Sequence, residues 1–98
     1  MDMSDYSALS LLLGAYLHQD FLHEFPSAMD AVQAFATQEP GDLVQTAADD
    51  ITKLLQDEQF QKSPDAALQA LHCCYLPRSE GRSPAEWLIQ VQRMLRRE

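Results

Sequence analysis

The stretch that decides the fold class is residues 83–95, which read SPAEWLIQVQRML. Ser83 is a typical helix N-cap, Pro84 suits the first helical position, and Glu86 is placed to reach back to the cap. Apolar residues then recur at helical spacing, and they are Trp87, Leu88, Val91, Met94 and Leu95. This segment therefore predicts an amphipathic α-helix that begins just after its serine.

The same spacing recurs in four earlier segments of the chain. Their apolar faces consist of Leu9, Leu12, Leu13, Tyr16 and Leu17; of Met29, Val32, Phe35 and Ala36; of Leu43, Val44, Ala47, Ile51, Leu54 and Leu55; and of Leu68 and Leu71. The predicted start signals are Ser4 or Asp5, Ser27 with Asp30, Asp42 after Pro40-Gly41, and Ser63-Pro64. Because β-branched residues are scattered through these helical patterns, strands are not expected. The sequence predicts an all-α fold, in which residues 1–98 form a single small bundle of about five helices.

Charge divides the chain into two unlike halves. Residues 1–52 contain nine acids and neither lysine nor arginine, whereas residues 53–98 contain seven bases and six acids. A field of one sign attracts a partner of the opposite sign and speeds its capture. The first half therefore indicates a basic protein partner, and a net charge of −8 argues against binding nucleic acid.

The sequence also bears on location. The acidic start, residues 1–5, lacks the positive region that opens a signal peptide. The longest apolar run, residues 11–17, has seven residues, whereas about 20 are needed to span a bilayer. Cys73 and Cys74 are adjacent, which is a poor geometry for a structural disulfide, so buried reduced thiols at a helix end are expected. We expect a cytoplasmic protein without membrane contact.

A cluster of potential ligands follows the first predicted helix, namely His18, Asp20, His23 and Glu24. Histidine and carboxylate side chains serve as metal ligands and as acid–base groups. On a continuous helix, however, positions 18 and 23 lie about 140° apart, and no third histidine or cysteine has the spacing of a zinc motif. We therefore predict no metal site, no cofactor and no catalytic residue here, and expect Asp20 to cap the chain where the first helix ends.

The carboxylates of the third predicted helix suggest a binding surface. On a helical wheel Asp42 and Asp49 lie opposite the apolar face, and Asp50 lies nearer its flank. Such a stripe is available to a partner, although solubility alone explains most exposed acids. Lys53 follows Asp49 by four residues, which predicts an ion pair between them.

A more specific pattern lies in residues 11–21, which read LLLGAYLHQDF. This stretch resembles the immunity proteins of bacterial contact-dependent growth inhibition systems, in which a leucine-rich segment runs into a Gly-Ala-Tyr-x-His-Gln-Asp motif followed by an aromatic residue. The Leu54-Leu55 pair and the late Trp87-Leu88 pair also fit. The resemblance spans most of the chain, and its specific core is Tyr16 to Phe21.

The resemblance implies a non-enzymatic bacterial protein that binds the cognate C-terminal toxin domain of a surface effector and protects the producing cell. Many such toxins are nucleases with basic active sites, which a carboxylate-bearing inhibitor can occupy. The candidate toxin-binding residues are Asp20, Glu24, Glu39, Asp42, Asp49 and Asp50, with Phe21 and Phe25 as possible aromatic anchors. For the motif residues Tyr16, His18, Asp20 and Phe21 we favour a structural role, which holds the first helix to the following loop.

The sequence leaves two other functional interpretations open. The first is a small acidic adaptor or regulatory domain that binds another basic protein in a groove between helices. The second is an enzyme with His18 and Asp20 at its centre, although a chain this short has room for few supporting residues.

Overall fold

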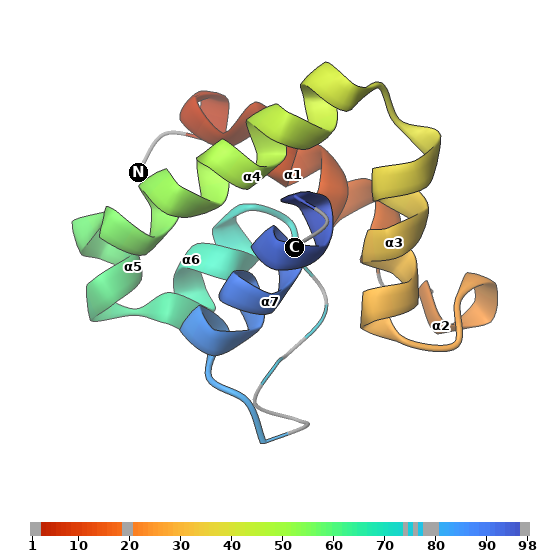
Figure 1. The fold of residues 1–98 in the computed structure, drawn as a ribbon. Helices are drawn as coiled ribbons and strands as arrows, with labels where there is room; N and C mark the ends of the chain where they lie inside the picture. Colours follow the sequence, from red (N-terminus) through yellow and green to blue (C-terminus); the bar gives the residue numbers. More distant parts are fainter. Residues whose placement is uncertain (1–2, 19–20, 74, 76, 78–80, 97–98) are drawn as a thin grey trace.

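The computed structural model describes residues 3–18, 21–73, 75, 77 and 81–96, and the regular structure within them is helical throughout (Figure 1). Short 3₁₀ and π segments, η1 and η2, flank the first α-helix. The elements are η1 Met3–Tyr6, α1 Ser7–Leu11, η2 Leu12–Tyr16, α2 Phe21–Glu24, α3 Ala28–Gln38, α4 Gly41–Gln56, α5 Glu58–Lys62, α6 Pro64–Ala70 and α7 Pro84–Arg96. The predicted all-α fold is confirmed.

Helix α4 lies at the centre of the packing, with α1 and α7 both against it and α3 against α7. Its buried face, Val44, Ala47, Ile51 and Leu54, is the one that the helical spacing predicted. Trp87 of α7 and Phe35 of α3 are the largest fully buried side chains. Burial of such a side chain stabilises a fold by about 1.5–3 kcal/mol, so this core supplies the main driving force.

Three predicted helix starts or stops are seen directly. Ser27 Oγ accepts the backbone N–H of Asp30 at 3.2 Å, and Ser83 Oγ accepts that of Glu86 at 3.2 Å. Helix α3 ends at Gln38, and α4 begins at Gly41 with Pro40 as its N-cap. Side-chain caps therefore set the starts of α3 and α7, whereas α4 begins one residue before the expected Asp42 and has no side-chain cap bond at its start.

The first helix differs from the prediction in two ways. Neither Ser4 nor Asp5 caps α1; its N-cap residue is Tyr6, which makes no side-chain capping bond. The chain then widens into the π-helix η2, in which the N–H of Leu17 bonds to the carbonyl of Leu12 at 3.3 Å. The wider turn brings Leu17 back over Leu12, and both are fully buried.

Gly14 in the middle of η2 allows a close approach to the end of α6. A Cβ at this position would lie 3.3 Å from the Cβ of His72. His72 itself has a φ of +67°. Its N–H bonds to Gln69 O at 2.9 Å, and the N–H of Cys73 bonds to Leu68 O at 3.1 Å. This pair of bonds is the Schellman motif, with a histidine where glycine is usual.

Two short helices were not anticipated. α2 lies in the segment that was expected to be a loop, and α5 follows α4 directly. Asp57 caps α5 by accepting the N–H of Gln59 at 2.8 Å, and Phe60 anchors it in the core. Of the adjacent cysteines, Cys73 is buried as expected, and Cys74 lies outside the described residues.

Candidate functional site

Asp50, a candidate contact residue from the sequence, is buried, with a relative exposure of 3%. Its Oδ2 accepts the backbone N–H of Leu9 at 3.2 Å, and its Oδ1 lies 3.3 Å from Lys53 Nζ. Leu9 is in the first turn of α1, so a carboxylate from α4 supplies the cap that α1 lacks at its own start. Asp50 is therefore inaccessible to a partner and holds α1 onto α4.

Lys53 also contacts Asp50, and the ion pair predicted between Lys53 and Asp49 is not the one observed. Lys53 binds Asp50 rather than Asp49. Its Nζ also donates to the carbonyl of Asp5 at 2.6 Å and lies 5.3 Å from the centre of the Tyr6 ring. Lys53 thus holds Asp5 and Tyr6 of the N-terminal segment against α4.

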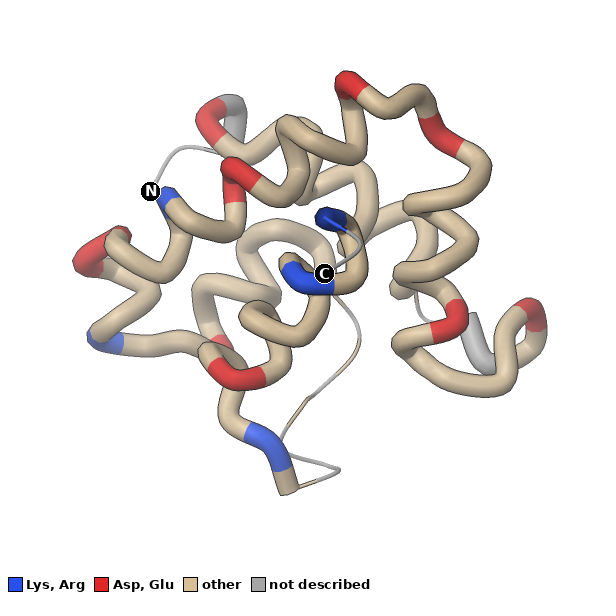
Figure 2. The backbone as a smooth tube through the Cα atoms, viewed as in Figure 1, with Lys and Arg blue, Asp and Glu red and all other residues tan. Residues whose placement is uncertain are grey.

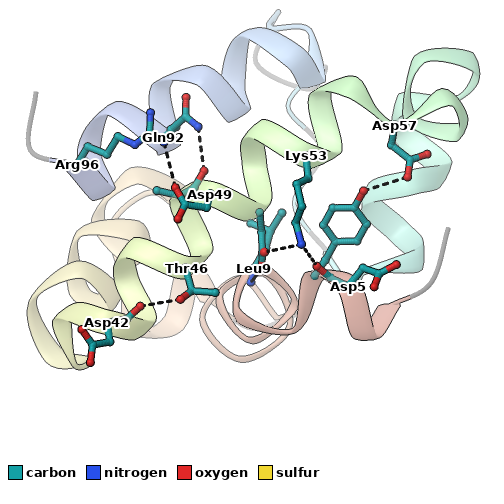
Figure 3. A network of polar contacts seen from close by, with 12 residues as sticks. Asp5, Leu9, Asp42, Thr46, Asp49, Lys53, Asp57, Gln92 and Arg96 are labelled. Carbon is teal, nitrogen blue, oxygen red and sulfur yellow. Dashed lines mark hydrogen bonds and ion pairs between the residues drawn. The ribbon is translucent and has the colours of Figure 1, made fainter.

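Asp49 faces solvent as predicted, but it takes part in the contact between α4 and α7. Its Oδ1 lies 3.3 Å from the Arg96 guanidinium and accepts Gln45 Nε2 at 3.2 Å. Beside it, Gln92 Nε2 donates to Ala48 O at 2.9 Å and to Thr52 Oγ1 at 2.7 Å (Figure 3). Arg96 and Gln45 therefore both engage the Asp49 carboxylate, which is still 59% exposed.

Glu39 lies at the corner between α3 and α4. The Tyr16 hydroxyl donates to Glu39 Oε1 at 2.8 Å. The Tyr16 ring packs edge-on against Phe35, with centroids 5.3 Å apart, and stacks on Phe25 at 6.4 Å. Burial, followed by the bond to Glu39, raises the pKa of Tyr16 above its ordinary value. A motif residue and a candidate contact residue are thus directly bonded.

His18 and Glu24 form a second link across the same segment. His18 Nε2 lies 3.2 Å from Glu24 Oε1, which connects the end of η2 to α2. Together with the Tyr16 contacts, this link supports the structural role favoured for the motif. Asp20 lies outside the described residues. Phe21 opens α2, and its side chain is not among those described.

The remaining described acids of this region belong to α2, α3 and the first turn of α4, and we call them together the acidic edge: Glu24, Asp30, Glu39 and Asp42. Residues 21–46 contain these four acids and no lysine or arginine, while the other 72 residues hold eleven acids and seven bases. Figure 2 shows acids but no bases on the end formed by α2 and α3. Asp42, in the first turn of α4, is exposed. The negative field is therefore densest at the acidic edge.

A second carboxylate–tyrosine pair lies at the other end of the molecule. The Tyr6 hydroxyl donates to Asp57 Oδ2 at 3.0 Å (Figure 3). Burial, followed by the contact with Asp57, raises the pKa of Tyr6 to about 12. The cap bond from Gln59 and the Tyr6 hydroxyl hold the pKa of Asp57 below its usual range. This pair joins η1 to the start of α5.

The described part of the chain lacks two other kinds of site. No group of three histidine, cysteine or acidic side chains there is arranged to hold a metal ion. None of the described helices is long and apolar enough to cross a membrane. A groove between α1, η2 and the end of α6 is lined by Ser10, Leu11, Gly14 and His72 among others, and these side chains form no recognisable catalytic set.

Comparison with known families gives one match over nearly the whole chain. The model of the family described as CdiI immunity protein matches residues 5–95. No curated protein and no solved structure matched the chain. The match confirms the resemblance carried by residues 11–21.

Proposed function

Because the chain belongs to the CdiI immunity protein family, we propose that it neutralises a cognate toxin by stoichiometric binding in the cytoplasm of the producing bacterium. The partner is the C-terminal toxin domain of a contact-dependent growth inhibition effector. The protein acts as a binding module rather than as an enzyme, and it uses neither a cofactor nor nucleic acid.

The acidic edge is the surface that best fits such a partner. Four acids lie there without a neighbouring lysine or arginine in the sequence, and Asp42 and Glu24 are exposed. A toxin that cleaves nucleic acid must attract phosphate, so its active site is basic. Carboxylates aligned on an inhibitor compete for that site and speed the encounter. A nuclease toxin is therefore the partner class that this charge pattern supports.

We propose a smaller set of contact residues than the sequence suggested. Asp50 is buried under α1, and Asp49 is paired with Arg96, so neither is part of the proposed interface. Glu24, Glu39 and Asp42 remain, and Asp20 stays a predicted contact. Phe25 is half-buried against Tyr16, which gives it a packing role in place of an anchor.

The function is tested by co-expressing this chain with the toxin domain encoded next to it. The expected result is relief of growth arrest and a 1:1 complex that survives gel filtration. The proposed immunity function would be wrong if growth arrest persists and no complex forms although the chain is expressed and folded.

The surface is tested separately by charge reversal. Glu24→Lys with Asp42→Lys changes two exposed acids of the acidic edge, and Glu58→Lys with Glu86→Lys makes the same change outside it. We expect the first pair to slow association about 10-fold or more at low salt, and the difference to shrink at high salt. Equal association rates for the two double variants would exclude the acidic edge.

A further inference from the structure

Glu39 differs from the other acids of the acidic edge in how firmly it is held. It is the C-terminal cap residue of α3, and its backbone N–H bonds to Phe35 O at 3.1 Å. Pro40, which follows, caps α4 and accepts the N–H of Val44 at 3.1 Å. Two helices thus fix the backbone on both sides of Glu39, and its side chain is half-buried.

The Glu39 side chain is fixed as well. Tyr16 donates its hydroxyl to Oε1 at 2.8 Å. The ring of Tyr16 is held by two aromatic neighbours, since Phe35 meets it at 90° with centroids 5.3 Å apart and Phe25 stacks on it with centroids 6.4 Å apart. A carboxylate has about four acceptor positions, so one bond from Tyr16 leaves acceptor capacity for a basic side chain of a partner.

From this arrangement we infer that Tyr16 is a positioning residue, which presents Glu39 as a pre-ordered carboxylate to an arginine or lysine of the toxin domain. The inference rests on the proposed function. A side chain that is already ordered loses less conformational freedom on binding than a free one. The exposed carboxylates of Asp42 and Glu24 then mainly attract the partner, whereas Glu39 holds it.

The consequence for kinetics is specific. Removing the Tyr16 hydroxyl leaves the charge of Glu39 in place, so long-range attraction and the association rate stay the same. The carboxylate becomes free to move, so the complex dissociates faster. Tyr16 acts only through Glu39, so the Tyr16 substitution has no further effect once the carboxylate is gone.

The test is a double-mutant cycle with Tyr16→Phe and Glu39→Gln, measured as binding to the toxin domain from the adjacent gene. Tyr16→Phe keeps the ring, and circular dichroism verifies that each variant folds. We expect about a 10-fold loss of affinity for Glu39→Gln and about a 3–10-fold faster dissociation for Tyr16→Phe. The double variant should bind no more weakly than Glu39→Gln alone.

Tyr6→Phe is the matched control, since it removes a hydroxyl that donates to Asp57 at 3.0 Å near α5, at the opposite end of the molecule from α2 (Figure 1). Its affinity should equal that of the wild type. Wild-type dissociation in a folded Tyr16→Phe variant, or additive losses in the double variant, would overturn the positioning role while the wild-type complex still supported the proposed function. Absence of a wild-type complex would instead overturn the proposed function.

Discussion

Replacing Asp50 by alanine tests how α1 is held to the rest of the fold. The substitution removes the acceptor of the Leu9 N–H, which lies 3.2 Å from Asp50 Oδ2. Leu9 is fully buried, so its N–H would lose the carboxylate acceptor at a position that is closed to solvent. Helix α1 has no side-chain cap of its own, and the N-terminal segment would lose one of its polar attachments to α4.

The size of the effect follows from these contacts. A hydrogen bond to a charged group contributes about 1.5–3 kcal/mol, and a buried donor left unpaired costs about 1–3 kcal/mol. The ion pair with Lys53 adds about 0–1 kcal/mol, because the lysine side chain is 55% exposed. We therefore expect Asp50→Ala to lower the free energy of unfolding by about 2–4 kcal/mol. Asp50→Asn keeps an acceptor and should cost about half as much.

Urea denaturation at pH 7 measures this loss, followed by the fluorescence of the fully buried Trp87 and by circular dichroism. Asp49→Ala is the matched control. Asp49 is adjacent to Asp50 in the chain, but its carboxylate is exposed and pairs only with Arg96 and Gln45 among the described residues. It should cost about 0–1 kcal/mol. The reasoning fails if Asp50→Ala is as stable as the wild type, or if the two alanine variants lose equal stability.

Two further predictions concern local strain and pH. His72→Gly should raise the free energy of unfolding by about 0.5–1 kcal/mol, because glycine adopts the φ of +67° without steric cost. His72→Ala keeps the backbone strain and should show no gain. Equal stability of the two variants in urea would contradict this explanation. The second concerns Tyr6, whose pKa is raised from 10.0 to about 12 by burial and by Asp57. Its contribution to stability is complete below pH 10 and is lost as the pH rises from 10 to 12, where the unfolded chain ionises first. Over this window the wild type should lose about 2–3 kcal/mol more than Tyr6→Phe, and parallel stability curves from denaturation at several pH values would refute the assignment.

The sequence predicted those parts of the fold that depend on local chemistry. Ser27, Pro40 and Ser83 bound their helices because capping involves residues within one turn of each other. The apolar face of α4 was found because its period persists over sixteen residues. Short helices lack such a period: α5 has five residues and α2 has four. For α5 the sequence did contain a signal, a capping Asp57 followed by the apolar Phe60. Such a short pattern does not distinguish a helix from a turn.

The role of individual acids could not be read from spacing. Asp49 and Asp50 are adjacent in the chain, yet one is paired across the surface with Arg96 and the other is buried against Leu9. These partners are more than 40 positions away, so only the tertiary structure decides between them. The helical spacing that predicted an Asp49–Lys53 pair was outweighed by the buried position of Asp50, where the same lysine compensates a charge removed from water.

Under the proposed function, different acids contribute to the rate of encounter and to the lifetime of the complex. The net charge alone cannot distinguish these two contributions. The rate of encounter depends on the summed field, so it responds to exposed charges such as Glu24 and Asp42 and weakens with salt. The lifetime of a complex depends on groups that are ordered at the interface, and Glu39 is the acid that Tyr16 holds in place. Charge reversal at Glu24 and Asp42 should therefore change association, and loss of the Tyr16 hydroxyl should change dissociation. If both substitutions altered the same rate constant, steering and docking would not be divided between different carboxylates, and the acidic edge would act as a single diffuse charge.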